Sequence, residues 1–275
     1  MTRKKQLREL TIKDNFMFAA VMMEEENCRK FLEITLGFPI DHVKVSREKS
    51  IVYHPEYKGI RLDVYARDEK RTHYNVEMQV TRKPALGKRV RYYHGQIDME
   101  LLLSGSGYAE LPDAYVIFIC DFDPFGKRKY RYTFQSKCKE DQEVDLEDGR
   151  CCVFLSTHGK NENEVSRELV NFLKFVKANQ EESQKDFQDH FVKQIQDSIR
   201  WIKSSREMEE RFMIFEEMMK DEREAGKREG EQAKARNTAF NMHQKGYPDE
   251  AIAEVLEVDV ETVLEWISES ESAAK

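Results

Sequence analysis

Three residues in the segment RLDVYARDEKRTHYNVEMQV, residues 61–80, have side chains suited to metal-assisted chemistry. Asp63 lies in the first of two alternating stretches, and Glu77 and Gln79 lie in the second. Carboxylate oxygens are ligands that Mg²⁺ accepts, commonly one or two of them together with waters and substrate phosphate. Gln79 follows Glu77 by two positions, so in a strand it faces the same side and its amide would orient a water or a phosphate oxygen. The pattern raises the question of whether these side chains meet at one cation.

The answer depends on how the two stretches pair. If the polar turn between them is centred on Lys70, the two residue numbers of each cross-strand pair sum to about 140. Asp63 then lies opposite Glu77, and two carboxylates facing each other repel unless a positive charge compensates them. Arg61 or Arg67 on the same face would give an ordinary solvated charge cluster, whereas a divalent cation would give a functional site. Alternation alone leaves both interpretations open, since polar outer faces are the rule for antiparallel sheets.

The elements that must position this hairpin alternate along the chain. Strands are expected at 43–53, 60–67, 73–80, 114–120, 130–135 and 151–156. Helices are expected at 12–37, as one or two helices, and at 88–103 and 162–178. AYVIFIC, residues 114–120, is a continuous apolar run typical of a central buried strand. Such alternation predicts one α/β domain over residues 1–180.

Residues 181–235 are highly charged and have sparse apolar residues at helical spacing, which predicts a charged helical arm. KREGEQAKARN within it is polar enough to form a loose joint. Residues 236–275 predict three short helices with helix-turn-helix spacing. Because Glu261, Glu265 and Glu269 lie on and around the exposed face of the last helix, we favour a protein contact over a DNA-reading role for this tail.

Composition bounds the class of protein. The chain has 275 residues, 35% of them charged, a net charge of −7 and no apolar run of membrane-spanning length. Its start has no secretory signal, and its five cysteines show no CxxC pair, so a reducing cytoplasm and no membrane are expected. The acidic total argues mildly against DNA, but the segment TRKPALGKRVR, residues 81–91, has five basic residues and no acid. This segment follows the Glu77–Gln79 strand directly and would form a phosphate-contacting rim beside the candidate site.

Asp63, a spacer, and Glu-x-Gln on the next strand resemble the core of the PD-(D/E)XK nucleases. More narrowly, the chain resembles their recombination-promoting nuclease and transposase family, in which Gln commonly replaces the usual Lys. KDNFMFAAVM with FLEITLG, GKRVRYYHGQIDMELLLSGSGYAEL before AYVIFICDF, and HQKGYPDEAIAEVLEVDVETVLEWI carry the resemblance from about residue 12 to 270. There is no Pro immediately before Asp63, where the name of the motif has one.

The resemblance implies a restriction-endonuclease-like α/β core, a mixed central sheet flanked by helices, with a C-terminal helical extension. It implies a Mg²⁺- or Mn²⁺-dependent DNA endonuclease, linked to recombination or a mobile element, in which Asp63 and Glu77 bind metal and Gln79 takes the Lys position. The residues expected to contact DNA are Arg82, Lys83, Lys88, Arg89, Arg91 and Gln96. Asp14 is a candidate third carboxylate, although acids at a helix start are favoured in any case.

The rival hypothesis is a protein that kept this fold but acts as a DNA- or protein-binding assembly module. The neutral Gln79, the acidic total charge and the helical arm favour it. Carboxylates splayed apart, or clamped by Arg61 and Arg67, would favour it too. Cutting both DNA strands usually takes two sites, so the 181–235 arm is a candidate homodimer interface.

Overall fold

The computed structural model describes residues 5–51 and 59–273, and the chain divides into two compact units. The first comprises Met1–Glu209 and the second Glu210–Lys275. The predicted strand at 43–53 has its last two residues outside the described part of the chain.

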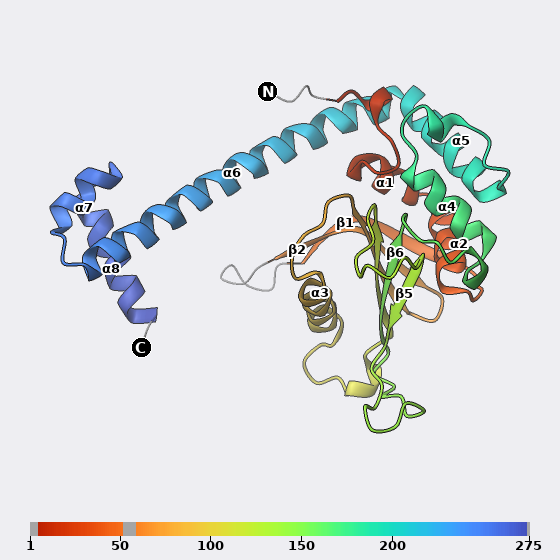
Figure 1. Ribbon diagram of the computed structural model, residues 1–275, viewed down its shortest axis with the longest axis horizontal. Coiled ribbons are helices and arrows are strands. Elements are labelled where there is room, and N and C mark those ends of the chain that lie inside the picture. Colours follow the sequence, from red (N-terminus) through yellow and green to blue (C-terminus); the bar gives the residue numbers. More distant parts are fainter. Residues whose placement is uncertain (1–4, 52–58, 274–275) are drawn as a thin grey trace. The chain divides into compact units, whose positions relative to one another are not determined.

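A six-stranded mixed sheet forms the centre of the first unit (Figure 1). Its strands are β1 (Val43–Ile51), β2 (Ile60–Asp68), β3 (His73–Gln79), β4 (Ala114–Cys120), β5 (Arg131–Phe134) and β6 (Arg150–Ser156). The spatial order is β1-β2-β3-β4-β6-β5. β1, β2 and β3 are antiparallel neighbours, β3, β4 and β6 run parallel, and β5 pairs antiparallel with β6. This confirms the predicted mixed α/β core.

The β2–β3 hairpin has the predicted register. Val64 pairs with Val76 and Arg67 with His73, so the paired numbers sum to 140, as a turn centred on Lys70 requires. The turn is closed by Asp68, whose Oδ1 accepts hydrogen bonds from the backbone N–H groups of Lys70 and Thr72. The local sequence therefore fixes which side chains of the two strands face each other.

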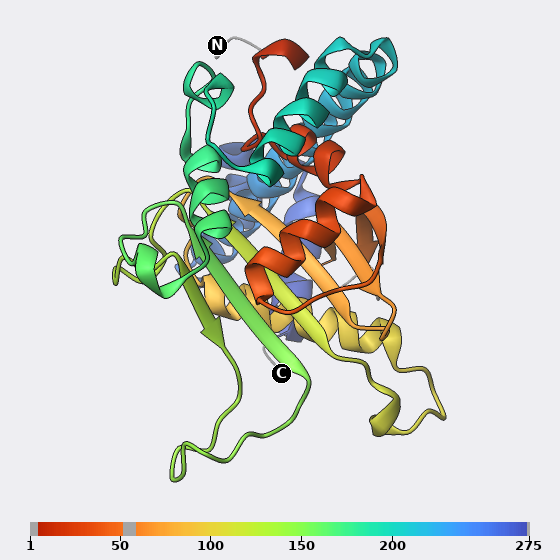
Figure 2. The ribbon, with the colours of Figure 1, turned by 90° about the vertical axis from the view of Figure 1, so that its right-hand side faces the viewer.

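Helices cover both faces of this sheet (Figure 2). Their bounds are α1 (Asn15–Met22), α2 (Glu25–Leu36), α3 (Leu86–Leu101), α4 (Arg167–Lys177) and α5 (His190–Ser204). α3 lies on one face, where its Val90, Tyr93 and Ile97 share one apolar cluster with Phe118 of β4. α1, α2 and α4 lie on the other face, and Phe31 of α2 contacts Phe172 of α4 with ring centroids 5.3 Å apart. β3, between the two layers, is buried along its whole length.

Two features of this unit differ from the expectation. The face carrying Glu77 and Gln79 was expected to be a polar outer face, but α3 covers it, whereas Val80, expected to point inward, is 44% exposed just after β3. Residues 190–204, which the sequence places in the arm, form α5 and pack on α1, α2 and α4. Phe191, Ile195 and Ile199 are buried there because they form the apolar face of α5, which packs against the core of this unit.

The second unit is helical. α6 (Arg206–Gln244) is one continuous helix, and α7 (Asp249–Leu256) and α8 (Val260–Ala273) follow it. Ala239, Ile252, Ala253, Val263 and Ile267 form its small core. The Asp259 side chain accepts a hydrogen bond from the Thr262 N–H and caps α8, as expected.

The predicted loose joint at KREGEQAKARN is wrong, since these residues lie within α6. The segment contains no proline, and ion pairs four residues apart, Lys220 with Glu224 and Lys227 with Glu231, support the helix on its exposed surface. Within the part of the chain that the structure describes, no helix has the length and apolar character needed to cross a membrane.

Candidate metal-dependent nuclease site

Asp63 and Glu77 come together where β2 and β3 separate. The paired ladder of the hairpin ends at Val64 and Val76. One step further, the Asp63 N–H donates to Glu77 Oε1 at 3.3 Å, and the Met78 N–H donates to Asp63 Oδ2 at 3.2 Å. Each carboxylate thus satisfies a backbone donor of the opposite strand that the diverging ladder leaves open. The two acids are held side by side and are not splayed apart.

Glu77 and Gln79 face the layer beneath α3. In the parallel register, Glu77 lies beside Phe118 and Gln79 beside Cys120, both of which belong to the apolar core under that helix. Glu77 is 2% exposed, and Asp63 is half-buried. A carboxylate at such depth needs a compensating charge, a bound cation or a proton.

The cation that the structure places on Glu77 is Arg89, from the first turns of α3. Arg89 Nη2 donates to Glu77 Oε2 at 2.9 Å, and Arg89 Nη1 donates to Gln79 Oε1 at 2.8 Å. The clamp on Glu77 therefore comes from α3, whereas the sequence suggested Arg61 or Arg67. The Gln79 amide also donates to the Thr81 carbonyl at 2.8 Å, so its oxygen is directed toward the site.

Burial dominates the electrostatics of Glu77. It raises the pKa of the Glu77 carboxyl, and the nearby Asp63 charge raises this pKa further. Arg89 acts in the opposite direction but does not cancel the first two effects. An acid whose charged form is destabilised in this way gains from any additional positive charge at the site.

Asn75 also belongs to this line of polar side chains, although no role was expected for it. It lies on the same strand face as Glu77 and is fully buried. Its amide makes no contact of strict hydrogen-bond geometry with a described atom, yet it lies close enough to the Glu77 carboxylate to act against the rise of the Glu77 pKa. The signal in the sequence is the run of alternate polar residues Asn75, Glu77 and Gln79 in a strand whose other face is apolar.

The donor set fits a hard divalent cation. Two carboxylates and an amide oxygen converge from adjacent strands, and the buried Asn75 amide beside Glu77 offers a further polar group at the same face. No cluster of three or more His, Cys, Asp or Glu side chains with metal-binding geometry occurs within residues 5–51 and 59–273. Waters and substrate phosphate would therefore complete the coordination, as is common for Mg²⁺.

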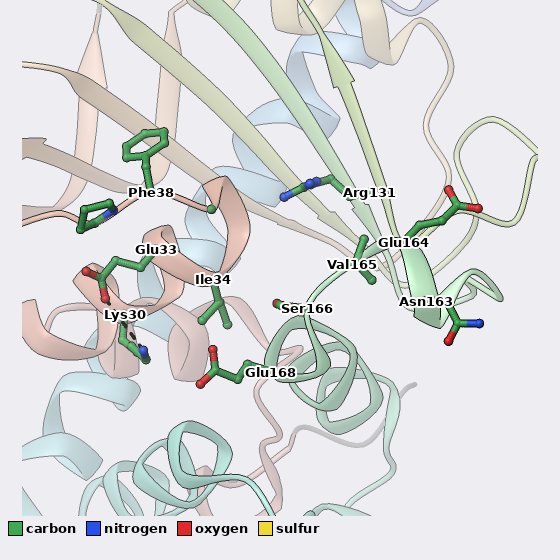
Figure 3. A pocket seen from close by; sticks show the side chains of 12 residues that line it. Lys30, Glu33, Ile34, Phe38, Arg131, Asn163, Glu164, Val165, Ser166 and Glu168 are labelled. Carbon is green, nitrogen blue, oxygen red and sulfur yellow. Dashed lines mark ion pairs between the residues drawn. The ribbon is translucent and has the colours of Figure 1, made fainter.

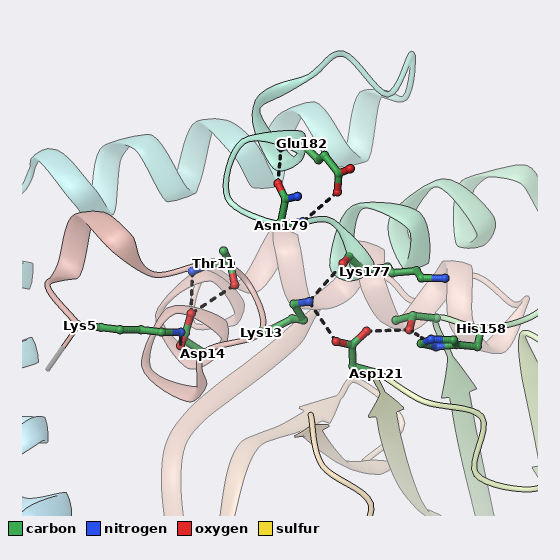
Figure 4. Close-up of polar contacts among 10 residues, drawn as sticks. Lys5, Thr11, Lys13, Asp14, Asp121, His158, Lys177, Asn179 and Glu182 are labelled. Atoms are coloured by element: carbon green, nitrogen blue, oxygen red, sulfur yellow. Dashed lines mark hydrogen bonds and ion pairs between the residues drawn. The ribbon is translucent and has the colours of Figure 1, made fainter. Parts of the chain in front are cut away.

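Asp14, the candidate third carboxylate, has a structural role (Figure 4). Its Oδ2 accepts hydrogen bonds from the Thr11 backbone and hydroxyl, and its Oδ1 pairs with Lys5 at 2.7 Å. Nearby, Lys13 bridges Asp121 and the Lys177 carbonyl, which ties the start of the chain to the ends of β4 and α4.

The residues expected to contact DNA separate into two groups. Lys83, Lys88 and Arg91 are exposed around the start of α3, and Gln96 is half-buried further along it. Arg82 is exposed, donates to the Asp123 carbonyl and lies over the Phe122 ring. Arg89 alone of the six bonds to Glu77 and Gln79 in the described contacts. Its spacing of four residues from Tyr93, on the buried face of α3, is the signal that could have identified this orientation.

A cavity of about 590 Å³ lies elsewhere, between α2 and the start of α4 (Figure 3). Its lining mixes acids and bases, including Lys30, Glu33, Arg131 and Glu168. Asp63, Glu77 and Gln79 do not line it, so it is separate from the candidate site.

A mixed sheet with two carboxylates at the point where adjacent strands diverge, backed by helices on both faces, defines the class of PD-(D/E)XK nuclease folds. Comparison with protein families agrees, since the model of the PD-(D/E)XK nuclease family transposases matches residues 13–237. The chain belongs to this family. No curated protein and no solved structure matches it.

Proposed function

We propose that this protein is a Mg²⁺- or Mn²⁺-dependent DNA endonuclease. Asp63 and Glu77 bind the metal, and Gln79 orients the attacking water or a phosphate oxygen. The observation that carries the proposal is the crossed contact between β2 and β3, which holds the half-buried Asp63 and the buried Glu77 side by side. Membership of a nuclease and transposase family supports DNA as the substrate and a link to recombination or a mobile element.

The reaction is phosphodiester hydrolysis. A water oxygen bonds to phosphorus, one P–O ester bond breaks, and the leaving oxygen takes up a proton and becomes a hydroxyl. A divalent ion at this site would lower the pKa of the water and polarise the phosphoryl oxygen. Asp63 and Glu77 supply the ligands of this ion, and the Gln79 amide orients the attacking water or a phosphate oxygen. The exposed positive charges of Lys83, Lys88 and Arg91 at the start of α3 contact the DNA backbone.

The central test is nicking of supercoiled plasmid with Mg²⁺ or Mn²⁺. Asp63→Ala and Glu77→Ala are expected to reduce the rate by roughly a hundredfold or more, because metal stabilisation of the transition state amounts to several kcal/mol. Glu168→Ala removes an exposed carboxylate of α4, on the opposite face of the sheet from α3, and is the matched control. Equal nicking by all four proteins would contradict the proposal.

One observation favours the rival function, a DNA- or protein-binding module without catalysis. Arg89 already pairs with Glu77 in the absence of metal. Calorimetric titration with Mn²⁺ separates the two functions. Binding that is lost in both Asp63→Ala and Glu77→Ala supports the nuclease, whereas no binding by the wild-type protein supports the rival.

The same proposal includes a homodimer through the helical arm and a cytoplasmic location. Support for the dimer comes from α6, on which Met213, Ile214 and Met218 are at least half exposed. Support for a reducing compartment comes from the cysteines, since Cys28, Cys120 and Cys151 are buried free thiols.

A further inference from the structure

The candidate site lacks a positive charge on the strand where the family motif usually has one. Gln79 takes the Lys position and is neutral, yet hydrolysis of a phosphodiester builds negative charge that an adjacent cation would stabilise. Arg89 supplies a guanidinium from the neighbouring helix. Its contacts with Glu77 and Gln79 place that charge between the metal-binding carboxylate and the residue at the Lys position.

Arg89 is held as a fixed group. Its Nε donates to the Tyr93 hydroxyl at 2.8 Å, and its guanidinium carbon lies 5.0 Å from the Tyr93 ring centroid and 5.3 Å from that of Phe118. Guanidinium stays protonated in proteins, and its planar fork matches carboxylate and phosphate oxygens. The side chain is 30% exposed, so the group is backed by aromatic rings and still reachable from outside.

The resting contacts of Arg89 use the same oxygens that a metal would use. Glu77 Oε2 and Gln79 Oε1 each accept one of its N–H groups. A cation arriving at Glu77 competes with Arg89 for that carboxylate, and the N–H groups that it displaces become available to another anion. The nearest anion in a bound complex would be the scissile phosphate, since that phosphate completes the coordination of the metal.

We propose that Arg89 supplies the catalytic positive charge that Gln79 omits, resting on Glu77 and Gln79 without metal and contacting the scissile phosphate when metal binds Glu77. This inference rests on the proposed nuclease function. It assigns Arg89 to the reacting phosphate, separately from the exposed basic residues that would hold the DNA backbone. It predicts that removal of the Arg89 guanidinium strengthens metal binding and weakens cleavage.

The first measurement is Mn²⁺ titration of the DNA-free protein by calorimetry. Arg89→Gln is expected to bind Mn²⁺ roughly threefold tighter or better than wild type, because the competing cation is gone. Arg200→Gln removes an exposed arginine of α5 and should bind Mn²⁺ like wild type. Unchanged or weaker Mn²⁺ binding by Arg89→Gln would overturn the inference, since a purely structural arginine would give that result.

The second measurement is plasmid nicking with relocation of the charge. Arg89→Gln should slow nicking roughly a hundredfold, the usual loss for one preorganised donor to a developing negative charge. Arg89→Gln combined with Gln79→Lys returns one cation to the site and should recover at least about tenfold of that loss. Arg89→Lys keeps the positive charge but lacks the planar guanidinium, so its nicking rate should lie between those of wild type and Arg89→Gln. This variant still tests the inference if Arg89→Gln folds poorly.

The outcomes separate the two proposals. If Asp63→Ala and Glu77→Ala abolish nicking while Arg89→Gln cuts like wild type, only the Arg89 inference fails. That inference also fails alone if the double variant, folded by circular dichroism, cuts no faster than Arg89→Gln. If the wild-type protein does not cut DNA, the nuclease function fails and the catalytic role of Arg89 fails with it, whatever the Mn²⁺ titration shows.

Discussion

At the scale of single residues, the burial of Glu77 costs stability. Glu77 is buried beside another carboxylate, and its contacts with the Asp63 N–H and Arg89 only partly offset that burial. A carboxylate buried in this way does not stabilise the fold in its charged form. Carboxylates with strongly shifted pKa values cluster at functional sites, and replacing such residues often stabilises a protein while abolishing its activity.

The raised pKa of Glu77 predicts how stability depends on pH. The folded protein holds the Glu77 proton at pH values where the unfolded chain, with an ordinary glutamate pKa of about 4.3, has released it. The contribution of protonated Glu77 to stability is therefore lost as pH rises toward the raised pKa. In urea unfolding with EDTA, Glu77→Gln is expected to gain free energy of unfolding relative to wild type between pH 5 and pH 9. A constant difference across that range would show that the pKa is not raised.

At the scale of secondary structure elements, the hairpin could be predicted and its surroundings could not. The polar turn and the alternation fix the register of β2 and β3, so Asp63 was correctly expected to meet Glu77. The burial of their shared face depends on α3, which packs there through contacts distant in sequence. Because a helix presents a different residue to the sheet with each 100° of rotation, the basic run alone did not separate inward Arg89 from exposed Lys88.

The packing of α3 on the sheet predicts a second pH effect. His94, 1% exposed, faces β6, where its Nε2 lies 3.4 Å from Cys152 Sγ. Burial lowers the pKa of His94 to about 4, and the charge of Arg150 acts in the same direction. The unfolded chain takes up a proton below about pH 6.5, while the folded protein resists it until about 4, so stability is lost as pH falls through this interval.

His94→Phe removes this titration and keeps a large ring beneath α3. Between pH 8 and pH 5, wild type should lose on the order of 2 kcal/mol more free energy of unfolding than His94→Phe, from about 1.4 kcal/mol per pH unit below the unfolded pKa. Urea denaturation at both pH values measures the difference. Above pH 7.5, the free energy of unfolding should vary with pH in the same way for wild type and His94→Phe. The same pH dependence for both proteins down to pH 5 would contradict the prediction.

At the scale of the whole molecule, α6 is the element on which the proposed homodimer depends. Residues 206–222 contain seven acidic and three basic residues, whereas residues 223–244 contain three acidic and five basic residues. Two copies of such a helix attract each other when they run antiparallel, since the acidic half of one lies beside the basic half of the other. The exposed Met213, Ile214 and Met218 would add apolar contact at the acidic half.

This charge pattern distinguishes a specific dimer from unspecific association of the exposed apolar residues. Light scattering after gel filtration is expected to show a dimer at 0.1 M salt whose dissociation constant rises several-fold at 0.5 M, because screening weakens the paired charges. Ile214→Glu should give a monomer, and Val144→Glu, an exposed apolar residue outside α6, should leave the dimer intact. Association that strengthens with salt would indicate apolar contact alone. A monomer at every concentration would contradict the dimer. Each molecule would then have one candidate site and would be expected to nick one DNA strand without cutting both.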